Sequence, residues 1–191
     1  MRVVSGELGG RRLVSPEGET TRPTSERVRE AIFNSLFSLD AVDGARVLDA
    51  FAGSGALGIE ALSRGASHTT FVESGREGLA AVRENVEALG LGATSQIVPG
   101  DAIAHLERMA RAGDDYDLVL LDPPYGFEAW EVLLGLMPDQ AVVVIESNRE
   151  VDLPDSWVVH RVKHYGSTVV TLATAGPRPN PADVASSEEE T

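Results

Sequence analysis

Cysteine is absent from this chain of 191 residues, and lysine nearly so, because fifteen of the sixteen basic residues are arginine. Without a thiol, the chain can form no disulfide, no thiolate zinc site and no covalent intermediate on a cysteine nucleophile. The four histidines, at positions 68, 105, 160 and 164, pair at metal-ligand spacing only by accident, which favours structural or surface roles for them. We therefore expect neither a disulfide nor a bound metal.

Long apolar runs are also missing from the sequence. None approaches the ~18–20 residues that a membrane-spanning helix needs, and the first residues lack the apolar segment of a signal peptide. These absences favour a cytoplasmic protein with no membrane partner. The length and the 42% of hydrophobic residues are typical of one globular domain.

The formal net charge of −14 argues against a polyanionic partner, because phosphate binding relies on lysine and arginine. The charge is unevenly distributed, however. Residues 1–29 hold six arginines and four glutamates, a local charge of +2, whereas residues 31–148 hold six arginines and eighteen acids, a local charge of −12. The amino-terminal arginines, which can fork onto phosphate or stack on a base, are therefore candidates for contact with nucleic acid. A solvated acidic surface is the alternative interpretation.

The order of strand and helix patterns predicts an α/β fold. From residue 45 onward, short β-branched runs alternate with helical periodicity, which is typical of a parallel sheet with helices on both faces. The expected strands cover residues 46–50, 69–73, 95–98, 118–121 and 141–146, and the expected helices cover 56–64, 76–89, 102–112 and 127–136. Two further strands, 157–165 and 168–174, are separated by two residues only, so they must form an antiparallel hairpin.

Both ends of the chain depart from this rhythm. Residues 3–4 and 11–14 predict a β-hairpin arm around a glycine-rich turn. A helix is then expected to begin at Thr24 or Ser25, with Val28, Ile32 and Leu36 as its apolar stripe. We divide the chain into the arm over residues 1–21, a doubly wound, Rossmann-like domain over residues 22–175, and a disordered acidic tail over residues 176–191.

A glycine-rich turn follows the first parallel strand. Gly53, Gly55 and Gly58 fit the G-x-G-x-x-G spacing, and Glu73 comes twenty residues after Gly53, at the end of the next strand. Open α/β sheets bind ligands at this edge, and a carboxylate there can accept two hydrogen bonds from a ribose diol. The pattern predicts a nucleoside cofactor without separating a nicotinamide dinucleotide from others. A purely structural turn and a solvated Glu73 are the alternatives.

The motif Asp122-Pro123-Pro124-Tyr125 directly follows the strand expected over residues 118–121. Its two prolines remove two backbone donors and stiffen the turn, which leaves carbonyl oxygens beside an acceptor-only carboxylate. Such a pair fits an NH2 group, which has two hydrogens to donate, and Tyr125 offers a face on which an extruded base can stack. We interpret Asp122, Pro123 and Tyr125 as a catalytic turn, with an ordinary strand-ending turn as the alternative.

These motifs resemble the class I S-adenosylmethionine-dependent methyltransferases, and within them the RsmD-like guanine-N2 methyltransferases of 16S (small-subunit) ribosomal RNA. The resemblance covers residues 1 to about 175. It rests on VSGELGGR at residues 4–11, RPT and RVRE within 22–30, DAFAGSGALG at 49–58 and DPPY at 122–125. DPPY also occurs in adenine-N6 methyltransferases, so it does not identify the subfamily. The amino-terminal motifs are what point to the RsmD-like enzymes. The resemblance implies a seven-stranded, mostly parallel sheet with a reversed last hairpin.

The resemblance also implies the cofactor S-adenosylmethionine and its site. It places Asp49 and the glycine turn against the methionine moiety, Glu73 on the ribose and Asp101 near the adenine, although Asp101 fits a helix cap equally well. The candidate cofactor-binding residues are Asp49, Phe51, Gly53, Ser54, Gly55, Glu73, Asp101 and Ala102. The candidate RNA-binding residues are Arg11, Arg12, Arg22, Arg27 and Arg29, with Arg149, Arg161 and Lys163 as weaker ones.

The expected reaction is methylation of one guanine in an assembled or assembling 30S subunit by a monomeric enzyme. Methylation of pyrimidine C5 needs a cysteine nucleophile, and the 2′-O reaction of the Lys-Asp-Lys-Glu type needs two lysines, whereas this chain has only Lys163. A nicotinamide oxidoreductase would leave residues 122–125 unexplained. A non-catalytic RNA-binding module would lose Asp49, Gly53 or Asp122. Adenine-N6 methylation of RNA or DNA is the main alternative.

Overall fold

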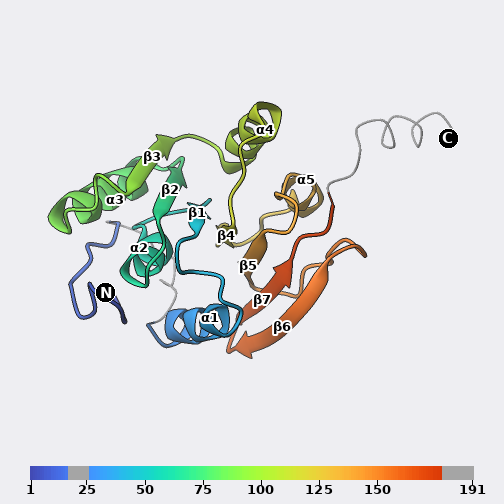
Figure 1. Ribbon diagram of the computed structural model, residues 1–191, viewed down its shortest axis with the longest axis horizontal. Coiled ribbons are helices and arrows are strands. Elements are labelled where there is room, and N and C mark those ends of the chain that lie inside the picture. The colour runs from blue at the N-terminus through green and yellow to red at the C-terminus, as the bar shows by residue number, and fades with distance from the viewer. Residues whose placement is uncertain (17–25, 178–191) are drawn as a thin grey trace, which may run out of the picture.

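The computed structural model describes residues 1–16 and 26–177, which contain a single seven-stranded sheet and five helices (Figure 1). The strands are β1 (Arg46–Asp49), β2 (His68–Glu73), β3 (Ser95–Pro99), β4 (Leu118–Leu121), β5 (Val142–Ser147), β6 (Val158–Tyr165) and β7 (Thr168–Thr174). The helices are α1 (Glu26–Ser38), α2 (Ala56–Ser63), α3 (Arg76–Ala88), α4 (Ala102–Ala112) and α5 (Trp130–Gly135).

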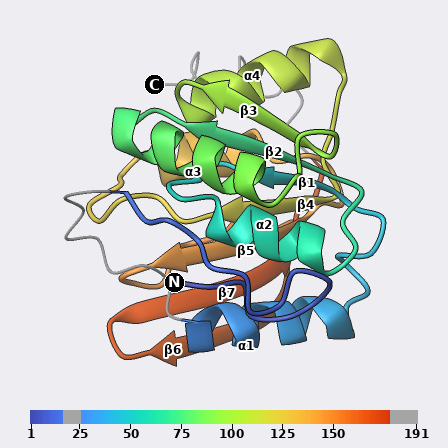
Figure 2. The same cartoon turned by 90° about the vertical axis from the view of Figure 1, so that its left-hand side faces the viewer.

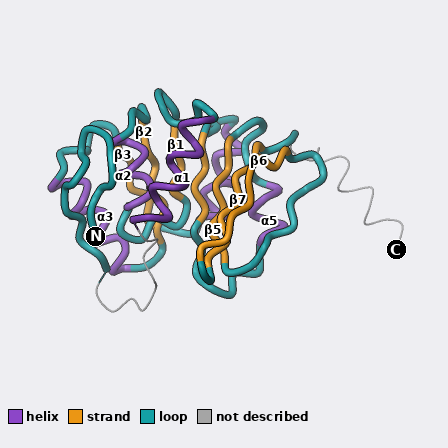
Figure 3. Tube along the Cα trace, turned by 90° about the horizontal axis from the view of Figure 1, so that it is seen from below, coloured by secondary structure: helices purple, strands orange, loops and turns teal. Residues whose placement is uncertain are grey.

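The sheet has the strand order β3-β2-β1-β4-β5-β7-β6 and runs across the whole molecule (Figure 3). Strands β1 to β5 pair in parallel, whereas β7 is antiparallel to both β5 and β6. The chain moves outward from β1 in one direction to β3 and then returns to β4 on the other side of β1. This reversal leaves a crevice at the carboxyl ends of β1 and β4, where open α/β sheets bind ligands.

Successive residues of each strand face opposite sides of the sheet, and this alternation divides the core into two layers. On β4, Leu118 and Leu120 pack with α1 and α2, whereas Val119 and Leu121 pack with α4 and α5. The expected stripe of α1 is also buried against the sheet. The doubly wound α/β fold with a terminal antiparallel hairpin is confirmed.

One expected helix starts later than predicted, and some expected features fall on residues that the structure does not describe. The helix expected from residue 127 begins only at Trp130, because residues 124–127 form a turn in which the Phe127 N–H donates to the Pro124 carbonyl at 3.1 Å. The proposed caps Thr24 and Ser25 and most of the expected tail lie outside the described residues.

The arm lies against the domain and passes between α2 and α1 (Figure 2). Its antiparallel pairing is smaller than expected, with one bridge between Arg2 and Arg12. Side chains of the domain also bond the backbone of the arm: Glu60 accepts hydrogen bonds from the N–H groups of Val4 and Ser5, and Asn85 bonds both the N–H and the carbonyl of Val14. The arm is therefore part of the wall of the domain.

Candidate functional site

A cleft of about 690 Å³ opens where β1, β2, β4 and β5 end. We call it the strand-end cleft. It brings together most of the residues that the sequence singled out, because parallel strands present their carboxyl ends at one edge of the sheet. The predicted site residues on its lining are Asp49, Phe51, Gly53, Ser54, Glu73, Asp122, Pro123, Tyr125 and Arg27.

The glycine-rich turn is folded tightly around Asp49. The buried Asp49 carboxylate accepts a hydrogen bond from the Gly58 N–H at 2.9 Å. A Cβ atom on Gly58 would lie 2.4 Å from the Phe71 ring, so glycine at this position lets α2 approach β2 closely. Gly55 has a φ of 78°, and a Cβ there would lie 2.8 Å from Val82 of α3. A Cβ on Gly53, by contrast, would point into open space.

Glu73 holds the other side of this turn in place. One of its carboxylate oxygens accepts from the Gly53 N–H at 2.7 Å, and the other accepts from the Gly75 N–H at 2.6 Å. Each carboxylate oxygen can accept a further hydrogen bond. The side chain is therefore fixed in position while keeping acceptor capacity for a diol.

The cleft is rich in negative charge. The pKa of Asp49 is raised to about 7, mainly by burial and further by the negative charges of Asp122 and Glu73, while the hydrogen bond from Gly58 acts in the opposite direction. A cation bound beside these carboxylates would relieve their repulsion and favour the ionised form of Asp49. The electrostatics of the cleft therefore suit a positively charged ligand.

The proline turn forms the opposite wall of the cleft. Asp122 is exposed to the cleft, Pro123 is buried, and the Tyr125 side chain is 59% exposed. The Pro124 carbonyl accepts one hydrogen bond within the turn, from the Phe127 N–H at 3.1 Å. Tyr125 is an exposed aromatic at the mouth of a polar cleft, which is the setting that base stacking requires.

Asp101 and Ala102 lie apart from the cleft lining. Asp101 is the N-cap of α4, where its carboxylate accepts from the Ala104 N–H at 2.9 Å, and Ala102 is buried in the core beside Leu106. The capping alternative for Asp101 is thus observed. A contact with adenine stays a prediction.

Sequence reasoning missed several residues of the cleft, including Glu146, Tyr165 and Met1. Glu146 lies near the end of β5 and is only 3% exposed. Its position at a strand end is the same signal that identified Asp49 and Asp122. Tyr165 and Met1 come from the terminal hairpin and the arm, and only the packing of these segments places them at the cleft.

The candidate RNA-binding arginines fall into three groups. Arg11, Arg12 and Arg27 are exposed, and Arg22 lies outside the described residues. Arg29 requires a correction: its side chain is fully buried, 3.5 Å from Glu60, and it donates to the Arg2 carbonyl. The helical face of Arg29 is covered by the arm, so this residue joins the arm to the domain and offers no surface to RNA.

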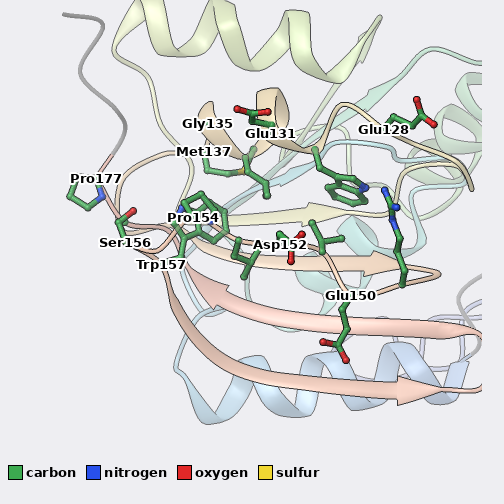
Figure 4. A pocket seen from close by; sticks show the side chains of 16 residues that line it. Glu128, Glu131, Gly135, Met137, Glu150, Asp152, Pro154, Ser156, Trp157 and Pro177 are labelled. Carbon is green, nitrogen blue, oxygen red and sulfur yellow. The ribbon is translucent and has the colours of Figure 1, made fainter. Parts of the chain in front are cut away.

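A second cavity of about 670 Å³ lies on the α4 and α5 side of the sheet, between α5 and the chain that leads into β6 (Figure 4). We call it the α5 groove. Both tryptophans of the chain line it, together with acidic side chains at its rim: Glu128, Glu131, Glu150 and Asp152. None of the predicted catalytic or cofactor-binding residues lines this groove.

Residues 1–16 and 26–177 contain no cluster of three or more His, Asp or Glu side chains that could hold a metal ion. No helix within these ranges has the length and apolar character needed to span a bilayer.

The comparison with known proteins assigns the family. A family model described as "Conserved hypothetical protein 95" matches residues 1–174. The chain belongs to this family. Ribosomal RNA small subunit methyltransferase D of Escherichia coli (strain K12) is 35% identical over 181 residues, which cover 90% of this chain and 88% of that protein. YlbH of Bacillus subtilis (strain 168) is 39% identical over 181 residues, covering 90% and 97% respectively.

A solved structure supports the same assignment. YhhF from Escherichia coli has a TM-score of 0.79 and 34% sequence identity, covering 92% of this chain and 98% of that chain. The resemblance to the RsmD-like methyltransferases and the methyltransferase fold that it implied are both confirmed.

Proposed function

We propose that this protein is an S-adenosylmethionine-dependent methyltransferase that modifies the exocyclic N2 amine of a guanine in small-subunit ribosomal RNA. The observation that carries the proposal is that one cleft holds both the glycine turn with Asp49 and Glu73 and the proline turn with Asp122 and Tyr125. The first pair suits a cofactor and the second suits a base. Family membership and the small-subunit methyltransferase D relative support the substrate class.

The residues of the cleft fit the cofactor chemically. The sulfonium and ammonium groups of S-adenosylmethionine are cations. Either group would reduce the mutual repulsion of the carboxylates of Asp49, Glu73 and Asp122. Glu73, held by two backbone N–H groups, has free acceptor capacity for the ribose diol. When bound, the cofactor supplies the electrophilic methyl carbon.

Asp122 and Tyr125 would prepare the nucleophile. The lone pair of a guanine N2 amine is delocalised into the ring, so the amine is a poor nucleophile. Hydrogen bonds from its two hydrogens to the Asp122 carboxylate and the Pro123 carbonyl favour the pyramidal form, with the lone pair directed along the line of transfer. Tyr125, exposed at the cleft mouth, would stack on the extruded base.

Arg11, Arg12 and Arg27 would contact RNA phosphates. These three are exposed, and Arg27 lies on the cleft itself. Because the rest of the chain is acidic, such a limited basic surface suits a structured target in which shape adds to affinity. We therefore place the reaction in an assembled or assembling 30S subunit.

The test is transfer of a labelled methyl group from S-adenosylmethionine to unmodified 30S subunits, free 16S rRNA and DNA, followed by digestion to nucleosides. The proposal expects label as N2-methylguanosine from the subunit. Label as N6-methyladenosine would show that the base was assigned wrongly, and label on DNA alone would show that the substrate class was wrong.

A further inference from the structure

Glu146 is a buried acid on the wall of the strand-end cleft to which the proposed mechanism gives no task. It is 3% exposed, and it lines the same cleft as Asp122 and Tyr125. A buried carboxylate is tolerated where charged or hydrogen-bonding groups face it, and the guanidinium of Arg29 is one such group for Glu146. Its place on the cleft wall with Asp122 and Tyr125 also makes Glu146 a candidate for contact with the base.

The sheet places Glu146 next to Asp122. In the parallel pairing of β4 with β5, Leu121 lies opposite Ile145, so Asp122, the first residue after β4, and Glu146 of β5 each follow this last pair directly. Neighbouring strands lie about 4.8 Å apart. Val144, two residues before Glu146, packs with α1 and α2, and strand alternation gives Glu146 the same side of the sheet. The two carboxylates thus come from adjacent strands at one edge.

Two adjacent acceptor groups match guanine and mismatch adenine. The Watson–Crick edge of guanine carries hydrogens on both N1 and N2, whereas N1 of adenine is a lone-pair acceptor. Asp122 alone cannot distinguish these bases, because both present an exocyclic amine. A second carboxylate opposite N1 would accept a hydrogen from guanine and repel the lone pair of adenine.

We propose that Glu146 is a specificity-determining residue that accepts the guanine N1–H while Asp122 accepts from the N2 amine. This inference rests on the proposed function and extends it to the choice of base. Discrimination is expected to be large, because a buried acceptor that loses its donor has no water to replace it.

A structural role for Glu146 is the competing explanation. Its negative charge lies near the buried guanidinium of Arg29 and partly offsets the cost of burying it. Glu60 does the same for Arg29, is equally buried, and is not among the residues that line the cleft. The substitution Glu60→Gln is therefore a matched control for a buried acid that supports Arg29 without facing the base.

The experiment measures methyl transfer by the wild type, Glu146→Gln and Glu60→Gln. The substrates are 30S subunits reconstituted from 16S rRNA with one of two bases at the methylated position. One substrate carries guanine, and the other carries 2-aminopurine, which keeps the N2 amine but has a lone pair at N1. For the wild type, we expect kcat/KM to be at least ~100-fold higher on guanine than on 2-aminopurine. For Glu146→Gln, we expect this ratio to fall to roughly tenfold or less, since an amide can accept from or donate to N1.

Glu60→Gln should lower both rates in parallel and leave the ratio unchanged. Binding of S-adenosylhomocysteine to each variant shows that the cleft is folded. If Glu146→Gln retains the wild-type ratio, or if it lowers both rates in parallel as Glu60→Gln does, the inference is overturned while the proposed function stands. If the wild type forms no N2-methylguanosine on the guanine substrate, the proposed function fails and the inference fails with it.

Discussion

The strand-end cleft and the α5 groove have nearly the same volume, about 690 Å³ and about 670 Å³, but they differ in how their acids are held. In the cleft, Asp49 is 1% exposed and bonded to the backbone of α2, and Glu73 is fixed by two further N–H groups. In the groove, Glu131 and Asp152 are exposed to solvent. Cavity size therefore does not identify the site. The carboxylates held in place at the strand ends favour the cleft as the site of the proposed reaction, because catalysis needs groups that are already positioned.

The largest expected difference between the two cavities concerns Asp122. We expect Asp122→Ala to lower kcat for methyl transfer by roughly 100- to 1000-fold, because the amine loses its charged acceptor. The matched change in the groove, Asp152→Ala, should leave kcat within about twofold, as is usual for an exposed surface residue. Steady-state kinetics on 30S subunits with both variants measures this. Equal losses of kcat in the two variants would contradict the assignment of the reaction to the strand-end cleft.

The arm arginines should show a smaller effect that is confined to binding. Arg11→Ala combined with Arg12→Ala should raise KM for RNA roughly tenfold and reduce the slope of log K against log salt by about two, since two phosphate contacts are lost. The pair Arg108→Ala and Arg111→Ala on α4 removes the same charge on the other side of the sheet, and it serves as the control. A fall in kcat with KM unchanged would show that the arm does not bind RNA.

The raised pKa of Asp49 predicts how cofactor binding depends on pH. Because its pKa is about 7, Asp49 ionises as the pH rises through neutrality and then attracts the cationic methionine group. We expect the Kd for S-adenosylmethionine to fall about tenfold between pH 5.5 and 7.5. Calorimetric titration of the wild type and Asp49→Asn measures this. The slope of log Kd against pH should be smaller in Asp49→Asn than in the wild type. An unchanged slope would assign the titration to another group.

The same raised pKa of Asp49 predicts that the stability of the fold depends on pH. The unfolded chain releases the Asp49 proton near pH 3.8 and the folded chain only near pH 7. The free energy of unfolding therefore falls as the pH rises between these values, and the loss is complete above pH 7. At pH 8, we expect Asp49→Asn to have a Tm roughly 5–10 °C above that of the wild type, and at pH 3.5 this advantage should vanish. Calorimetry showing a lower Tm for the variant at pH 8 would contradict the assignment.

Most of the sheet could be predicted from sequence because its signals are local. Hydrophobic runs such as residues 118–121, and the two-residue link between β6 and β7, fix strand positions and the final hairpin without tertiary information. Asp49, Glu73 and Asp122 were predictable for the same reason, since each lies at or just after the end of a strand.

Contacts between distant segments could not be predicted in this way. The burial of Arg29 depends on the arm covering α1 and on Glu60 of α2, which lies 31 positions further along the chain. The helical pattern of α1 alone places Arg29 outside the apolar stripe, which predicts an exposed side chain. The place of Tyr165 in the cleft likewise depends on how the terminal hairpin packs.

The most direct test of the account is hydrogen exchange with and without S-adenosylhomocysteine, because it reports on both cavities in one experiment. We expect slower exchange at the amides of residues 49–58 and 73–75, which surround Asp49 and Glu73 in the strand-end cleft. Residues 149–157 of the α5 groove should be unaffected. Protection confined to residues 149–157 would place the cofactor in the groove and contradict the account.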